Sequence, residues 1–225
     1  MHETDHSTDD VSTKALLAGE APRAMDPGLG YWELLERMVV GGWPGFRGLS
    51  TSDVSANLMD YLAALERIFA VEDQPAWSAH LRSGATLRKE PKRHFADPSL
   101  AAAALGVDVD GLMADPAYTG QLFESLVVQH LRVFAQPLRG VVCHARNSYG
   151  REVDAVVQLP DRAWAGFEVK LGASPETVEL AAESLKRFAE QTETPPVSLT
   201  VVTSSGPSYR RPDGINVVAI GALAP

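Results

Sequence analysis

The order of helical and strand-like segments after residue 117 restricts the fold more than any other feature of this sequence. Residues 117–135 are predicted to form a helix, because apolar residues recur there at helical spacing. The apolar stripe consists of Phe123, Val127, Leu131 and Phe134. The segments that follow are three strand candidates at 139–145, 151–159 and 164–172, a helix at 174–191 and strands at 197–203 and 215–220. This order predicts an α/β domain over 115–225, with a mixed sheet flanked by the two helices.

The first half of the chain has a different character. Residues 1–13 are polar and almost free of apolar residues, which predicts a disordered tail. Residues 14–114 are expected to be mostly helical, with a basic hairpin over 80–97, where Ser83-Gly84 separates two extended arms. The expected helices are a short piece after residue 13, one over 31–42, one starting near Ser52 or Asp53, and one over 98–105 that is capped by Asp97 and closed by Gly106.

Charge and cysteine content limit the binding modes and the cellular location that we expect for the protein. The 225 residues carry a formal net charge of −9, which argues against nonspecific coating of nucleic acid by the whole surface but leaves room for a local basic patch. The single cysteine, Cys143, precludes an intrachain disulfide. The sequence shows no apolar run long enough to cross a membrane, and its polar, acidic start lacks a signal-peptide pattern. We therefore expect a cytoplasmic protein without membrane contact.

Charged residues interrupt strands that otherwise look buried. Asp154 lies in the middle of the strand candidate 151–159, and Glu168 and Lys170 lie near the end of 164–172. Because strand side chains alternate between faces, Glu168 and Lys170 are expected on one face, and Asp154 is expected to share a face with Glu152 and Val156. On the helix before them, Glu124 falls beside the apolar stripe. The four charged groups at 124, 154, 168 and 170 are therefore predicted to converge at one edge of the sheet.

Such a set of side chains is suited to a divalent cation. Burying charged groups is costly unless they are paired or hold a metal. Carboxylates are the ligands that Mg²⁺ prefers, and this ion keeps waters and binds phosphate oxygens. The sequence predicts that Glu124, Asp154 and Glu168 bind Mg²⁺ or Mn²⁺. A nearby lysine, Lys170, would help to polarise an attacking water and to stabilise charge on a phosphate.

The spacing D-x(13)-E-x-K after a helical glutamate resembles the PD-(D/E)xK nuclease superfamily. The resemblance implies a restriction-endonuclease-like α-β-β-β-α-β core with catalytic Glu124, Asp154, Glu168 and Lys170. Val153 stands where the motif has its proline. A closer resemblance covers most of the chain. The segments "LLERMVVGGWPGF", "YLAALERIFAVEDQPAWS", "KEPKRHFADPSLAAAALG", "GQLFESLVVQHL", "GREVDAVV" and "FEVK" are similar to the C-terminal region of bacterial and archaeal AAA+-type ATP-binding proteins, a region that ends in a nuclease-like domain of unknown function.

The sequence departs from that family in two ways. It contains no G-x-x-x-x-G-K-[ST] motif, so no ATP site of this type is expected in it. The winged-helix-like segment of the family is shortened here, which makes the chain resemble a truncated member. The basic residues of the expected hairpin could contact nucleic-acid phosphates in the manner of a wing. These residues are Arg82, Arg88, Lys89, Lys92 and Arg93.

Two classes of function remain open from sequence. One is a metal-dependent nuclease or nuclease-like protein that acts on or binds DNA or another nucleic acid, with water activated by Mg²⁺ for phosphodiester hydrolysis. The other is a non-catalytic interaction or regulatory module that docks on a partner such as an ATPase. The intact acid and lysine set favours the first class, and the shortened N-terminal segment favours the second.

Overall fold

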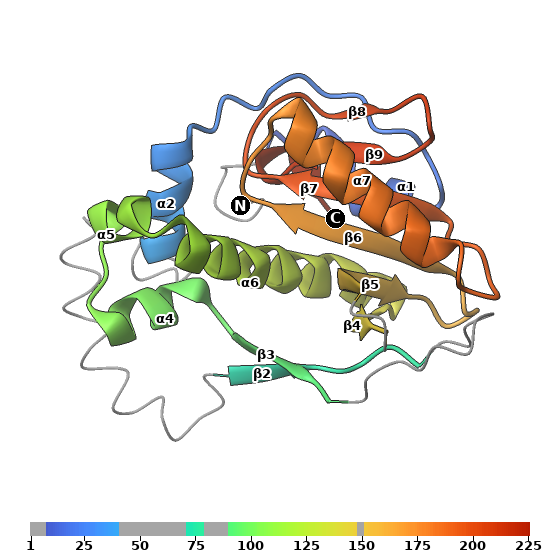
Figure 1. The fold of residues 1–225 in the computed structure, drawn as a ribbon, viewed down its shortest axis with the longest axis horizontal. Coiled ribbons are helices and arrows are strands. Elements are labelled where there is room, and N and C mark those ends of the chain that lie inside the picture. Colours follow the sequence, from blue (N-terminus) through green and yellow to red (C-terminus); the bar gives the residue numbers. More distant parts are fainter. Residues whose placement is uncertain (1–7, 41–70, 79–89, 148–150) are drawn as a thin grey trace.

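A computed structural model of the chain describes residues 8–40, 71–78, 90–147 and 151–225. The helix expected to start near residue 52 lies outside these ranges, as does most of the predicted basic hairpin, including Arg82, Arg88 and Lys89. The described residues form a mixed α/β structure in which helices pack on both faces of a six-stranded sheet (Figure 1).

The sheet mixes antiparallel and parallel neighbours in the order β4-β5-β6-β7-β9-β8. The strands are β4 (Val141–Arg146), β5 (Glu152–Gln158), β6 (Trp164–Lys170), β7 (Ser198–Thr203), β8 (Tyr209–Arg210) and β9 (Asn216–Ala219). The first three strands form an antiparallel meander, and β6, β7 and β9 run parallel to one another. Five of these strands coincide with the sequence prediction to within two residues at each end. The exposed edge strand β8 has only two residues and was not predicted.

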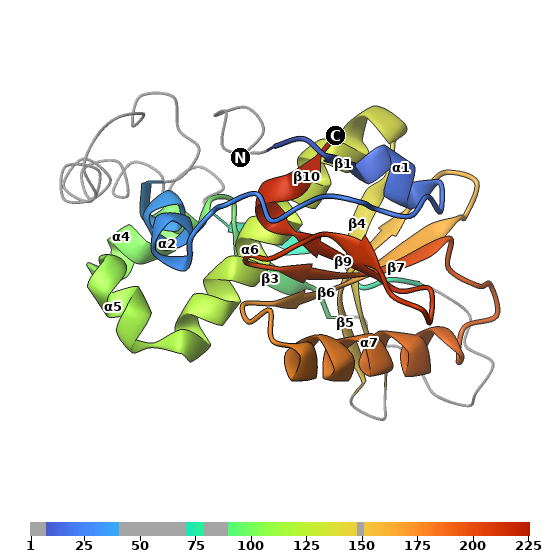
Figure 2. The same ribbon diagram turned by 90° about the horizontal axis from the view of Figure 1, so that it is seen from above.

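Helices α6 (Pro116–Ala135) and α7 (Pro175–Ala189) cover opposite faces of the sheet. Phe123, Val127 and Leu131 of α6 belong to one buried cluster, which includes Phe167 from the sheet. Leu185 and Phe188 of α7 belong to a second cluster, on the other face. Figure 2 shows α7 alone along its side of the sheet. The flanking helices predicted from periodicity are thus confirmed, and the side chain of Ser174 caps α7 as expected.

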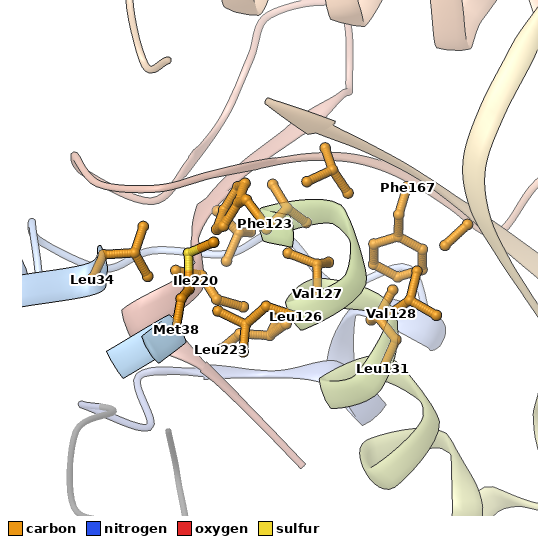
Figure 3. Close-up of a cluster of buried hydrophobic side chains, with 14 of the residues drawn as sticks. Leu34, Met38, Phe123, Leu126, Val127, Val128, Leu131, Phe167, Ile220 and Leu223 are labelled. Atoms are coloured by element: carbon orange, nitrogen blue, oxygen red, sulfur yellow. The ribbon is translucent and has the colours of Figure 1, made fainter. Parts of the chain in front are cut away.

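The N-terminal helices pack on α6 and extend its apolar cluster. They are α1 (Thr13–Leu17), α2 (Tyr31–Val40), α4 (Pro98–Leu105) and α5 (Val109–Ala114), and the turns η3 (Gln136–Leu138) and η4 (Ile220–Ala222) complete the described helical segments. Figure 3 shows Leu34 and Met38 of α2 lying against the cluster formed by α6 and the C-terminal segment. Residues from both predicted halves of the chain therefore share one core. The prediction that Asp97 caps α4 and that Gly106 ends it is confirmed.

Two pairings differ from the sequence expectation. Val11 and Ser12 fall in the predicted disordered tail, yet they form β1 (Val11–Ser12), which pairs in parallel with β10 (Leu223–Ala224) (Figure 2). The hairpin-like pair also differs. Its arms are β2 (Val71–Gln74) and β3 (Lys92–Phe95), so the first arm precedes the segment 80–97 in which both arms were expected. In both places the strand forms because it pairs with a segment far away in the sequence, and local composition gives no sign of such a partner.

Candidate functional site

A break in the pairing between β5 and β6 positions Asp154. The β5–β6 ladder ends at the pair Ala155 and Phe167, although β6 continues to Lys170 beside β7. On its other side, β5 pairs with β4 through an irregular register, and this disturbs the alternation of faces. Val153 then lies on the α7 face and Ala155 on the α6 face. The expectation that Asp154 simply shares a face with Val156 is therefore wrong, because a bulge intervenes.

Asp154 replaces a ladder partner at this break. Its Oδ2 accepts a hydrogen bond from the backbone N–H of Val169 at 2.8 Å. A buried backbone N–H needs an acceptor, and here a carboxylate supplies it where the neighbouring strand has moved away. The bond holds Asp154 beside the residue that follows Glu168. The bulge in β5 thus brings an acid from one strand to the charged end of the next.

Glu168 and Lys170 form a pair at the end of β6. The ammonium of Lys170 lies 2.9 Å from Oε1 of Glu168, which confirms that the two side chains share a face. Glu168 is 7% exposed, and its Oε2 is buried without a hydrogen-bond partner. A buried carboxylate oxygen without a donor is costly, and such an atom in a native fold calls for an explanation. This oxygen is therefore the atom of Glu168 that is open to a further donor or ligand.

A second lysine reaches the same cluster from the hairpin. Lys92 of β3 forms ion pairs with Glu124 of α6, at 2.9 Å, and with Glu152 of β5. Its ammonium also lies 3.8 Å from Oδ1 of Asp154. Lys92 was predicted to contact nucleic-acid phosphates from a basic hairpin. The structure places it among three carboxylates, with 26% of its side chain exposed.

Buried hydrogen bonds fix the strand that carries Lys92. His94, two residues further on, contacts the hydroxyl of Ser125 at 2.9 Å through Nδ1 and the side-chain oxygen of Gln74 at 3.0 Å through Nε2. The amide of Gln74 donates to the backbone carbonyls of Cys143 and Asp154. Because Ser125 follows Glu124, this network ties β2 and β3 to the helix and the strand that hold the acids.

The pKa values of the acids reflect burial and mutual repulsion. Burial, and then the charge of Asp154, raises the pKa of Glu168 to about 7. Burial also raises the pKa of Asp154 and of Glu124, and the hydrogen bond from Val169 and the charge of Lys92 oppose the rise only in part. Glu152 differs. Burial acts to raise its pKa, but its contact with Lys92 outweighs this effect and lowers it.

The two lysines have the opposite response. Burial alone would lower the pKa of Lys92, yet Glu124, Glu152 and Asp154 hold it above its ordinary value. The pKa of Lys170 is also raised, because the charges of Glu168, Asp154 and Glu124 outweigh the effect of burial. Both ammonium groups therefore stay charged at neutral pH and offset part of the negative charge of the cluster.

The structure places some of the predicted site residues close together and others apart. Asp154 accepts from the backbone N–H of Val169, between Glu168 and Lys170, and those two side chains pair with each other. Glu124 is engaged by Lys92 from the hairpin. Arg93, predicted to contact nucleic acid, is exposed and pairs with Asp73 on its own hairpin. The sequence prediction placed Glu152 beside Asp154 but gave it no role. It did not foresee that Lys92 would lie among the acids. One sequence signal was available. Side chains alternate along a strand, so Lys92 and His94 lie on one face and Arg93 on the other, and a buried His94 implies that Lys92 also points inward.

The described carboxylates could supply two ligands to a cation but do not form a complete ligand set. Within the described part of the chain, no three His, Cys, Asp or Glu side chains lie together as a ready-made metal cluster. Mg²⁺, however, is commonly bound by only one or two carboxylates with waters completing its shell. Asp154 and Glu168 can supply two, and the partnerless Oε2 of Glu168 is an oxygen suited to such an ion. Glu124 pairs with Lys92, whose ammonium lies 2.9 Å from Oε1 of Glu124 and 3.8 Å from Oδ1 of Asp154.

Two family models without an established role match separate parts of the chain. Residues 119–223 match the family model Domain of unknown function (DUF4143), and residues 49–111 match Domain of unknown function (DUF8612). The first match contains every sheet strand from β4 to β9 and the acids 124, 152, 154 and 168. No curated protein and no solved structure gave a significant match. Among the described helices, none is both long and apolar enough to span a bilayer.

Proposed function

We propose that this chain is a nuclease-like protein that uses a divalent cation to hydrolyse, or to hold, the phosphodiester backbone of a nucleic acid. In this proposal the sheet with α6 and α7 is a restriction-endonuclease-like core, and the region before it is a shortened winged-helix-like segment. The observation that carries the proposal is the pair Asp154 and Glu168. Asp154, whose side chain is 13% exposed, and the buried Glu168 lie on neighbouring strands where the strands separate, with Lys170 paired to Glu168 and one Glu168 oxygen left without a donor.

The residues present define what each group would do. Asp154 and Glu168 would hold Mg²⁺ or Mn²⁺, and the ion when bound would supply charge neutralisation and a water of lowered pKa. Asp154 stays oriented through its second oxygen by the N–H of Val169. Lys170 keeps its ammonium at Glu168 and can donate to a phosphate oxygen or to a water on the same side. Because the acids are shielded from water, their electrostatic attraction for a cation would be stronger than at an exposed site.

A cation titration of the full chain tests the proposal. Isothermal calorimetry with MgCl₂ and MnCl₂ should give saturable binding for the wild type, and a thermal melt should shift upward with the ion. Asp154→Asn should abolish both responses. We choose asparagine because its oxygen can still accept from Val169, whereas alanine would orphan that N–H. Glu183→Gln is the matched control, since it removes one exposed carboxylate from α7.

Catalysis needs its own assay. The wild type should nick a supercoiled plasmid or cut a single-stranded oligonucleotide in Mn²⁺, and Lys170→Ala should lose that cleavage while still binding the ion. An unaltered calorimetric response in Asp154→Asn would refute the cation site. Cation binding without cleavage of any DNA or RNA probe would reduce the proposal to a binding role.

A second candidate, a non-catalytic interaction module, is favoured by one observation. Lys92 already pairs with Glu124 and Glu152, so part of the acid set is satisfied as an ordinary salt-bridge network. In that case the domain would serve to dock a partner, and an ATPase is the natural proposal because this domain is commonly found with AAA ATPases. A wild type that shows neither cation binding nor cleavage would favour this candidate over the first.

A further inference from the structure

We propose that Lys92 is a built-in counter-ion of the acid site, which competes with a divalent cation for the charge of the carboxylates. This inference rests on the proposed cation site and names a regulator of it. The ammonium and the ion exclude each other, so cation binding requires Lys92 to leave its partners. No sequence motif assigns this role to Lys92, and it emerges from the position of the hairpin.

The contacts of Lys92 place it beside the proposed ligands. Its ammonium bridges Glu124 and Glu152, and it lies 3.8 Å from Oδ1 of Asp154. The other oxygen of Asp154 is held by Val169, so Oδ1 is the atom left for an ion. A cation on that oxygen would have the ammonium as an immediate neighbour, and like charges at such separation repel strongly where burial limits screening.

The charge of the cluster leads to the same conclusion. Four carboxylates, from Glu124, Glu152, Asp154 and Glu168, face three cationic groups, those of Lys92, Lys170 and Arg146. With all of them ionised, the formal charge is −1, which does not match a divalent ion. Withdrawal of Lys92 leaves −2, the charge that one Mg²⁺ neutralises. The site is thus better matched to either the lysine or the ion than to both.

Hydrogen bonds of its neighbours fix the backbone at Lys92, whereas its long side chain has several rotatable bonds. The contact between His94 and Ser125, together with the bonds that Gln74 makes to β4 and β5, anchors the strand on which Lys92 lies. The four-carbon lysine stem is flexible, and a quarter of this side chain reaches solvent. The ammonium can therefore swing outward without unfolding β3. That property distinguishes a displaceable counter-ion from a fully buried structural one.

Calorimetry on charge variants of the full chain tests the inference. Lys92→Met should tighten the binding of Mg²⁺ at least tenfold relative to the wild type, because it removes the competing charge and keeps the length of the stem. Lys92→Arg keeps the charge and should bind the ion no more tightly than the wild type. Arg93→Met is the matched control, since it removes a neighbouring charge that pairs with Asp73 on the hairpin, and it should stay within twofold of the wild type.

A labelling measurement on the wild type avoids any dependence on whether the variant folds. An amine-reactive reagent, with modified sites mapped by mass spectrometry, should modify Lys92 several-fold faster in saturating Mg²⁺ than in chelator. The exposed Lys186 on α7 reports general effects of the salt and should not change.

The outcomes separate this inference from the proposed function. Wild-type binding of Mg²⁺ with no gain in Lys92→Met and no change in labelling overturns the counter-ion and leaves the cation site standing. Binding that appears only in Lys92→Met supports the counter-ion and shows that the wild-type chain is closed to the ion. Absence of binding in both proteins overturns the cation site and, with it, any competition by Lys92.

Discussion

Substitution of Glu168 by glutamine should make the protein more stable at alkaline pH and leave it unchanged in acid. Glu168 is buried, its Oε2 has no partner, and its pKa is raised to about 7 from an ordinary value of 4.5. Between these two values the folded chain binds more protons at this site than the unfolded chain. The free energy of unfolding therefore falls as the pH rises from about 4.5 to about 7.

The size of the effect follows from the interval between the two pKa values. About 2.5 pH units at about 1.4 kcal/mol each give a destabilisation of about 3 kcal/mol when Glu168 is fully ionised in the fold. Glutamine has the shape of the protonated acid, and its oxygen can still accept from Lys170. Glu168→Gln should therefore match the wild type below about pH 4 and exceed it by up to about 3 kcal/mol at pH 8.5.

Urea denaturation followed by circular dichroism, in chelator and at several pH values, measures this difference. Subtraction of the variant curve from the wild-type curve removes the titration of groups that do not interact with Glu168. Glu183→Gln, on the exposed face of α7, should differ from the wild type by no more than about 0.5 kcal/mol at every pH. A constant offset for Glu168→Gln across the pH range, or a loss of stability at pH 8.5, would refute the reasoning.

Three further predictions concern the scaffold, and chemical denaturation measures each of them. Phe188→Ala should destabilise the chain by about 3–5 kcal/mol, because it empties the centre of the cluster under α7; a loss below about 1 kcal/mol would contradict this packing. Gly166→Ala should cost about 1–3 kcal/mol, since the new Cβ would lie 3.0 Å from Leu199 and 3.2 Å from Trp164; a neutral result would mean that both side chains yield easily. Asp97→Ala should cost about 1 kcal/mol through loss of the α4 cap, and Asp97→Asn should recover most of it.

The sheet and its two flanking helices could be predicted because their signals are local. The apolar stripe of α6 repeats within one helix, and Ser174 lies next to the helix that it caps. The shared face of Glu168 and Lys170 follows from strand alternation, which needs no knowledge of neighbouring strands. Local periodicity and capping therefore predicted five strands of the sheet, its two flanking helices and their order, and the pairing of Glu168 with Lys170.

Only the tertiary structure decided how the remaining charges are arranged. The bulge that turns Asp154 toward Val169 depends on the registers of two different ladders, so alternation along β5 alone misplaced it. β1 consists of two residues whose partner lies at the far end of the chain, and no window of sequence contains both. Lys92 reaches Glu124 across 32 positions through a hairpin whose docking depends on buried hydrogen bonds of His94 and Gln74. A charge in a polar segment looks solvated in sequence, and whether it is buried among acids depends on what the fold packs against it.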